Sequence, residues 1–148
     1  MILDAQNLFS TAQALTATAA STNVIDLGVA RDIGTTGFAP APSVVAQVIT
    51  AMLSGGSSTL TITVQGSTDN STFDDMVSTR AIPKASLTAG ALFSVKMPPL
   101  QIGQSLPRYL RLNYTVGTAN FTDGTITAWL GLDVQRNRAY PAGNYVSN

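Results

Sequence analysis

The chain has 148 residues, contains no Cys, His or Glu, and its eight Asp residues are balanced by eight Lys and Arg residues, so its formal net charge is zero. This composition removes the commonest general bases, thiol nucleophiles and soft metal ligands, so we expect neither an enzyme nor a bound cofactor. It also lacks the basic excess with which nucleic-acid-binding proteins contact phosphates.

The first residues do not fit a targeting segment. Asp4, Gln6 and Asn7 interrupt the apolar run that a secretory leader needs, and the first basic residue is Arg31. No stretch reaches the roughly 18 apolar residues of a membrane helix, so we expect no membrane partner. The chain is predicted to be one domain over 1–148, with an N-terminal arm over about residues 1–12.

Alternating apolar and polar residues, typical of strands with one buried face, recur along the rest of the chain. In chain order the segments are 15–18, 24–27, 44–53, 60–64, 73–79, 93–97, 110–116 and 126–132. Turn residues separate them: a Pro- and Gly-rich loop at 34–43, then Gly55-Gly56, Asp69-Asn70, Pro98-Pro99 and Asp123-Gly124. Residues 85–90 fit a short helical turn at most.

The strand at 44–53 differs from the others because both of its faces carry apolar residues. It is either a central strand covered on both sides or a strand that meets another subunit. About eight strands, each with one solvated face, predict an all-β, single-domain, double-sheet sandwich of jelly-roll type.

The best candidate for a hard cation such as Ca²⁺ is the segment 69–75, which groups three carboxylates on one loop. It lacks the Gly and the final Glu of an EF-hand loop. The favoured interpretation is a turn, in which Asp69 and Asn70 bond the backbone while Asp74 and Asp75 keep a strand end in water. We therefore predict no metal site.

Trp129 is the single tryptophan, and the alternation places it on the polar side of the last strand, beside Thr127. Three interpretations stay open for an outward indole ring. It stacks on a sugar, it anchors a protein interface, or it is covered by loops or the tail of the same chain.

The C-terminal tail, over about residues 135–148, has no apolar period. It carries residue types that are enriched at interfaces, namely Arg136, Arg138, Tyr140 and Tyr145. The tail either docks on a neighbouring molecule or is a frayed terminus.

Several segments resemble one known family. They are the opening Met1-Ile2-Leu3-Asp4-Ala5, then Phe9-Ser10, Ala12-Gln13-Ala14, the run 19–28, Arg31-Asp32-Ile33-Gly34, the run 108–114 and the Thr-rich last strand. These segments are similar to the jelly-roll capsid cement (decoration) proteins of short-tailed bacteriophages, of the Bordetella-phage type. The likeness is thin through 38–56 and 72–103.

The resemblance implies a protein made in the cytoplasm of the bacterial host and located on the outer capsid surface of the virion. There it would form a homodimer or homotrimer and bridge neighbouring major capsid proteins. The opening would be a structural arm or first strand, lying across the sandwich or a partner. The predicted partner-binding residues are Ile2, Leu3, Leu8, Trp129, Arg136, Arg138, Tyr140 and Tyr145.

Two alternatives accompany this hypothesis. Arg31 and Asp32 either pair with a neighbouring subunit or take part in an internal ion pair. The rival function is a lectin-like binding module of a phage tail fibre or spike. It would need an aromatic and polar cluster at one end of the sandwich, or Ca²⁺ held by Asp69, Asp74 and Asp75.

Overall fold

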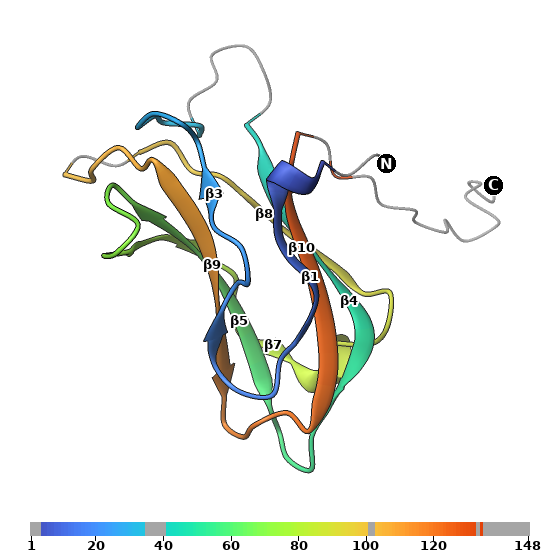
Figure 1. Cartoon of the computed structure of the whole chain (residues 1–148). Helices are drawn as coiled ribbons and strands as arrows, with labels where there is room; N and C mark the ends of the chain where they lie inside the picture. The colour runs from blue at the N-terminus through green and yellow to red at the C-terminus, as the bar shows by residue number, and fades with distance from the viewer. Residues whose placement is uncertain (1–3, 35–40, 101–102, 133, 135–148) are drawn as a thin grey trace, which may run out of the picture.

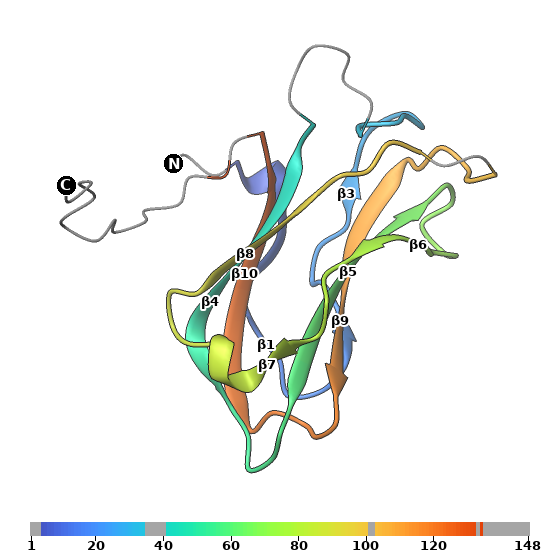
Figure 2. The ribbon, with the colours of Figure 1, turned by 180° about the vertical axis from the view of Figure 1, so that it is seen from behind.

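A computed structural model describes residues 4–34, 41–100, 103–132 and 134. Its strands are β1 (Leu8–Ala14), β2 (Ala19–Ala20), β3 (Ile25–Asp26), β4 (Ser43–Leu53), β5 (Thr59–Ser67), β6 (Asp74–Ser78), β7 (Ile82–Pro83), β8 (Leu92–Lys96), β9 (Tyr109–Gly117) and β10 (Asp123–Gly131). Two 3₁₀ turns accompany them, η1 (Ala5–Asn7) and η2 (Lys84–Ser86). No helix in these ranges has the length and apolar character needed to cross a membrane. The strands form two layers that face each other, as Figures 1 and 2 show from opposite sides.

The order of the strands identifies the sandwich type. Sheet A has the order β1-β10-β4-β8, and sheet B has the order β2-β9-β5-β6, with β3 also beside β9 and β7 also beside β5. The ten described strands therefore occupy eight positions, because β2 and β3 share one and β6 and β7 share another. In chain order, the first position pairs with the last, the second with the seventh, the third with the sixth and the fourth with the fifth. This is a long hairpin rolled into a double sheet, so the predicted jelly-roll sandwich is confirmed.

The core lies between the two sheets and follows the alternation of the sequence. Leu60, Ile62 and Val64 of β5 are buried there, and their neighbours across the ladder are Val116, Tyr114 and Leu112 of β9. Sheet A closes the core from the other side with Val44, Ala46 and Val48 of β4 and Ile126 and Ala128 of β10. Each large apolar side chain removed from water contributes roughly 1.5–3 kcal/mol, so these facing rows hold the two sheets together.

The first strand occupies part of the predicted arm. Where the sequence predicts an arm over 1–12, η1 covers residues 5–7 and β1 begins at Leu8. Phe9 is completely buried in the core. The segment from Leu8 onward is thus the first strand of the fold, which was one of the two forms expected for the opening.

Other boundaries differ in smaller ways. The predicted strands at 24–27, 44–53 and 73–79 correspond to β3, β4 and β6, and the helical turn predicted at 85–90 corresponds to η2. Residues 15–18 do not form the predicted strand, since 16–18 are bends, although Leu15 is buried. The two-residue strands β2 and β7 were not predicted.

A buried pair of hydroxyl groups joins the two sheets near β1. Ser10 Oγ lies 2.8 Å from the hydroxyl of Tyr114 and donates to Gln13 Oε1 at 2.7 Å. Because a serine hydroxyl has one proton, Tyr114 is the donor to Ser10. Gln13 continues the network, since its Nε2 donates to the Ala20 carbonyl and its Oε1 accepts the Thr22 N–H. Burial raises the pKa of Tyr114, and the bond to Ser10 only partly opposes this effect.

The raised pKa of Tyr114 predicts a loss of stability at alkaline pH. The unfolded chain ionises its tyrosines above about pH 10 while the folded chain keeps Tyr114 neutral, so the free energy of unfolding falls as pH rises. The stabilisation is complete below the unfolded pKa and is lost as pH approaches the folded pKa. Tyr114→Phe should flatten this dependence by up to about 1.4 kcal/mol per pH unit. Urea unfolding of both proteins from about pH 9 upward measures the two slopes. Tyr109→Phe is the matched control, and equal slopes for wild type and Tyr114→Phe would contradict the prediction.

Candidate interaction surfaces

The outer face of sheet B carries a polar row that crosses three strands. Arg111 Nε of β9 donates to Gln65 Oε1 of β5 at 2.8 Å, and Gln65 Nε2 donates to Asp75 Oδ1 of β6 at 2.7 Å. The guanidinium of Arg111 also lies over the Phe73 ring, 3.8 Å from its centroid. The charged groups of this row are therefore partnered within the chain.

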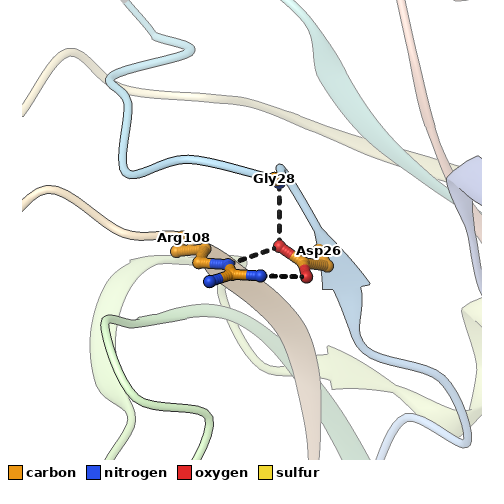
Figure 3. A network of polar contacts seen from close by, with 3 residues as sticks. All are labelled: Asp26, Gly28 and Arg108. Atoms are coloured by element: carbon orange, nitrogen blue, oxygen red, sulfur yellow. Dashed lines mark hydrogen bonds and ion pairs between the residues drawn. The ribbon is translucent and has the colours of Figure 1, made fainter.

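An ion pair at one end of the same face ties β3 to the start of β9 (Figure 3). Arg108 Nε and Nη2 each donate to Asp26 at 2.9 Å, and the Gly28 N–H donates to the same carboxylate at 2.8 Å. The hydrogen bond from Arg108 lowers the pKa of Asp26, and the bond from Gly28 adds to the effect. Both side chains are more than 40% exposed, at 42% for Arg108 and 45% for Asp26, so water screens the pair. Its role is to position β3 against β9.

The outer face of sheet A is different, because it is almost uncharged. Its charged side chains among the described residues stand at opposite ends: Lys96 lies at the end where β8 pairs with Ser43, and Asp123 lies opposite Leu53. Between them the outward residues of β4 and β10 are neutral. Ile49 and Leu53 expose 46% and 53% of their surface. The sandwich thus has one polar face, on which the charged side chains described above have partners in the same chain, and one neutral face with exposed aliphatic side chains.

Trp129 lies on this neutral face, as the alternation predicted. It pairs with Leu8 of β1 on one side and with Val45 of β4 on the other, and it stands outside the core cluster between the sheets. Trp129 is nevertheless only 3% exposed, and η1 contacts the strand that carries it. Among the described residues, its Nε1 is the one buried side-chain polar atom without a hydrogen-bond partner. Of the three interpretations of Trp129, the structure supports burial by other residues of the same chain.

The predicted partner-binding residues divide into two groups. Leu8 and Trp129 are cross-strand neighbours on the outer face of sheet A, and Leu8 is half-buried. The others lie outside the described residues: Ile2, Leu3, Arg136, Arg138, Tyr140 and Tyr145. The sequence analysis does not single out the exposed Ile49 and Leu53, although both belong to the two-sided apolar pattern of 44–53.

The Asp-rich loop is a turn, as the favoured interpretation of the sequence has it. Asp69 Oδ1 accepts the N–H groups of Ser71 and Thr72 at 2.9 Å and the hydroxyl of Ser67 at 2.9 Å. The bonds from Thr72 and then Ser71 lower the pKa of Asp69. Asn70 has a φ of 59°, the left-handed conformation that Asn tolerates in turns. Within the described residues, no three acidic side chains are grouped so as to hold a metal ion.

This loop geometry predicts that a chelator leaves the melting temperature unchanged. A ligand that binds only the folded state at a hundred times its dissociation constant adds about 2.7 kcal/mol, which shifts the melting temperature by several degrees. Thermal unfolding with EDTA and with millimolar Ca²⁺ should superimpose. A calcium-dependent rise of several degrees, lost in Asp69→Asn, would restore the lectin-type site.

Asp32 is engaged inside its own chain. Its Oδ1 accepts the Gly34 N–H at 2.9 Å, and its Oδ2 accepts the Leu100 N–H at 3.1 Å. The backbone N–H of Arg31 donates to the Pro107 carbonyl at 3.1 Å. The carboxylate therefore fastens the loop after β3 to the loop after β8. Pairing of Arg31 or Asp32 with a neighbouring subunit stays a prediction.

Comparison with known proteins gives one informative match. No curated protein matches the chain. Among solved structures, the PBSX exported protein XepA is similar, with a TM-score of 0.43 and 16% sequence identity. That match covers 95% of this chain, which spans only 42% of the length of XepA. The Bbp16 family, a family of Bordetella phage proteins, matches residues 9–130, which include every strand from Phe9 of β1 through most of β10. The chain therefore belongs to the Bbp16 family.

Proposed function

We propose that this phage-family protein is a capsid cement, which binds the outer surface of the assembled shell and bridges neighbouring major capsid proteins. The observation that carries the proposal is the difference between the two outer faces. Sheet B pairs its charges internally, whereas sheet A presents a neutral surface with Ile49 and Leu53 exposed. The centres of protein interfaces are depleted in charge in the same way.

The energetics of a cement favour a modest contact of this kind. A protein that binds only the assembled lattice opposes disassembly by mass action. Each copy needs an interface of only about 1,000 Å² per neighbour, because many copies act on one closed surface. In this proposal, the neutral face of sheet A is the docking face. The other predicted partner-binding residues, in the opening and the tail, are proposed to contact the shell as well.

The lectin-like alternative has less support from the aromatic side chains. A sugar-binding site needs an open aromatic face. Trp129 is covered, Phe73 carries the guanidinium of Arg111, and Tyr109 carries that of Arg108 at 4.9 Å from the ring centroid. A glycan array with reproducible binding would favour the lectin hypothesis over the cement.

The cement proposal is tested on shells assembled from the major capsid protein of the same phage. Added protein should cosediment with the shells and raise the temperature at which they rupture. Ile49→Asp places a charge on the neutral face, so it should weaken binding at least about tenfold. Thr115→Asp places the same charge on sheet B, where Thr115 is exposed, and should bind like wild type. Shells that neither bind nor gain heat resistance from the wild-type protein would refute the proposal.

Self-association is part of the same proposal, and we expect a homodimer or homotrimer in solution. The exposed aliphatic residues of β4 motivate this expectation. A compact monomer of this length has a radius of gyration of roughly 15 Å. Small-angle scattering at micromolar concentration should return a larger value and a mass two or three times that of the chain. The monomer values would count against self-association and would leave shell binding to be judged separately.

A further inference from the structure

A protein that bridges two neighbours needs two contact sites, and the neutral face of sheet A supplies one of them. A candidate for the other lies on sheet B, where β6 begins. A cavity of about 390 Å³ is lined there by the turn between β5 and β6 and by residues that lead into β9. Figure 2 shows these segments side by side at one end of the sandwich. Ligand sites typically have volumes of roughly 300–1,000 Å³, so the cavity is large enough to hold a side chain and the group beside it.

The cavity has an apolar floor and a polar rim. A Cβ added to Gly66 would lie 2.9 Å from Met76 Sδ and 2.9 Å from Pro107 Cβ, so these two side chains close over the glycine. All three residues line the cavity, and Gly66 and Pro107 are buried. The exposed lining residues include three hydroxyl groups and one carboxylate, those of Thr68, Thr72, Ser105 and Asp74.

The walls of the cavity are fixed by hydrogen bonds. Ser67 Oγ accepts the N–H groups of Asp69 at 3.2 Å and Asn70 at 3.0 Å, and Asp69 Oδ1 accepts the Thr72 N–H at 2.9 Å. The opposite wall is fastened to this turn, because the Arg108 N–H donates to the Ser67 carbonyl at 2.9 Å. The cavity is therefore preformed, and a ligand does not have to order these walls when it binds.

Asp74 gives the cavity its charge. Gln65 and Asp75 are cross-strand partners that bond each other on the outer face, so the next pair, Gly66 and Asp74, faces inward. Within the described residues, the Asp74 carboxylate makes no hydrogen bond or ion pair, and no Lys or Arg lines the cavity. Gln104 also lines the cavity but already has an interaction within the chain, so the ligand contacts are assigned to other residues. An unpaired carboxylate above an apolar floor complements an apolar group with a positive charge beside it.

We propose that this cavity receives an apolar side chain and a neighbouring Lys or Arg from a loop of the major capsid protein. The apolar side chain rests on Met76 and Pro107, and the basic group meets Asp74 at the rim. The hydroxyl groups of Thr68 and Ser105 bond the backbone of the loop. The inference rests on the proposed cement function and adds to it: sheet A contacts one capsid subunit, and the cavity contacts the neighbouring one.

The first test compares the same substitution at two adjacent positions of β6, by cosedimentation with the shells described above. Asp74→Asn and Asp75→Asn each remove one negative charge, but Asp75 faces outward, and an asparagine there can still accept the bond from Gln65. At low salt, Asp74→Asn should bind at least about threefold more weakly than Asp75→Asn. High salt screens an exposed ion pair, so it should remove most of this difference.

The second test fills the cavity. Ser105→Phe places a ring at its rim and should weaken shell binding at least about tenfold, whereas Thr115→Phe, on the exposed outer face of sheet B, should bind like wild type. Equal melting temperatures would show that both variants fold. If wild type binds and Asp74→Asn binds as tightly as Asp75→Asn at low salt, the cavity proposal fails while the cement proposal stands. If wild type does not bind at all, the cement proposal itself fails.

Three other outcomes would assign the cavity differently, and each would overturn the proposal. Saturable binding of n-butylguanidinium to the free protein that is lost in Asp74→Asn, with shell binding unchanged, would identify a free organic cation as the ligand. Self-association lost in Asp74→Asn, with shell binding unchanged, would identify a second copy of this chain. Aggregation of Asp74→Asn, again with unchanged shell binding, would show that the inward charge serves only to keep other strands from pairing with β6.

Discussion

Replacing Phe9 by alanine should lower the free energy of unfolding by about 3–5 kcal/mol, which corresponds to a fall in melting temperature of roughly 10 °C. Phe9 is completely buried, and it anchors β1 to the core from a strand whose register is otherwise irregular. The loss combines the transfer of the ring to water with the cavity left between the sheets. Thermal and urea unfolding followed by circular dichroism provide the measurement.

The control for Phe9→Ala is Thr11→Ala, two residues further along the same strand, where the side chain is exposed. It should change stability by less than about 0.5 kcal/mol. If Phe9→Ala were equally harmless, the opening would be an arm that leaves the sandwich intact. The single tryptophan gives an additional readout, because Leu8 is the cross-strand neighbour of Trp129. Loss of β1 should therefore shift the tryptophan emission to the red.

Gly124→Ala is expected to destabilise the protein by several kcal/mol. Gly124 has a φ of 137°, a conformation that strains any residue with a side chain by about 1–3 kcal/mol. An added Cβ would also lie 2.9 Å from the backbone Cα of Met52, which cannot move without disturbing β4. The strand β10 begins here, so the strain falls on the pairing that holds sheet A together.

Gly55→Ala is the matched control for Gly124→Ala. A Cβ at Gly55 would meet no atom within 4 Å, and this residue does not have a positive φ. Its substitution should be neutral or slightly stabilising, because alanine reduces the freedom of the unfolded chain. Equal unfolding midpoints for the two variants would show that the start of β10 tolerates a side chain and would contradict the described geometry.

The sequence predicted the regular strands well, because their alternation is long and uninterrupted. In the predicted segments 60–64 and 110–116, apolar residues alternate without a break, and in β5 and β9 these apolar residues face the core. The same alternation placed Trp129 on the outer side of β10. For these elements, local pattern and tertiary packing agree.

The remaining elements were beyond the pattern for identifiable reasons. The two register shifts of β1 and the positive φ of Ala12 break the period of two, so Phe9 and Ser10 are both buried although they are adjacent. The strands β2 and β7 are only two residues long and form because β9 and β5 offer them partners. The burial of Trp129 on the outer side of its strand depends on tertiary packing, which no local pattern encodes.

The candidate surfaces were predictable only in part. The pattern of 44–53 indicates a strand with apolar residues on both faces. Which of its outward side chains are covered and which are exposed becomes clear only from the pairing of β4 with β10. That register shows Val45 covered and Ile49 and Leu53 exposed on one strand.

The number of copies of this protein in purified virions tests the central claim most directly. A cement binds every equivalent site of the shell, so quantitative mass spectrometry of virion proteins should find it at an abundance comparable to that of the major capsid protein, with hundreds of copies in each particle. Treatment that strips it from intact virions should then lower the temperature at which the shells rupture. A count of only a few copies per particle would place the protein in the tail and would contradict the cement function.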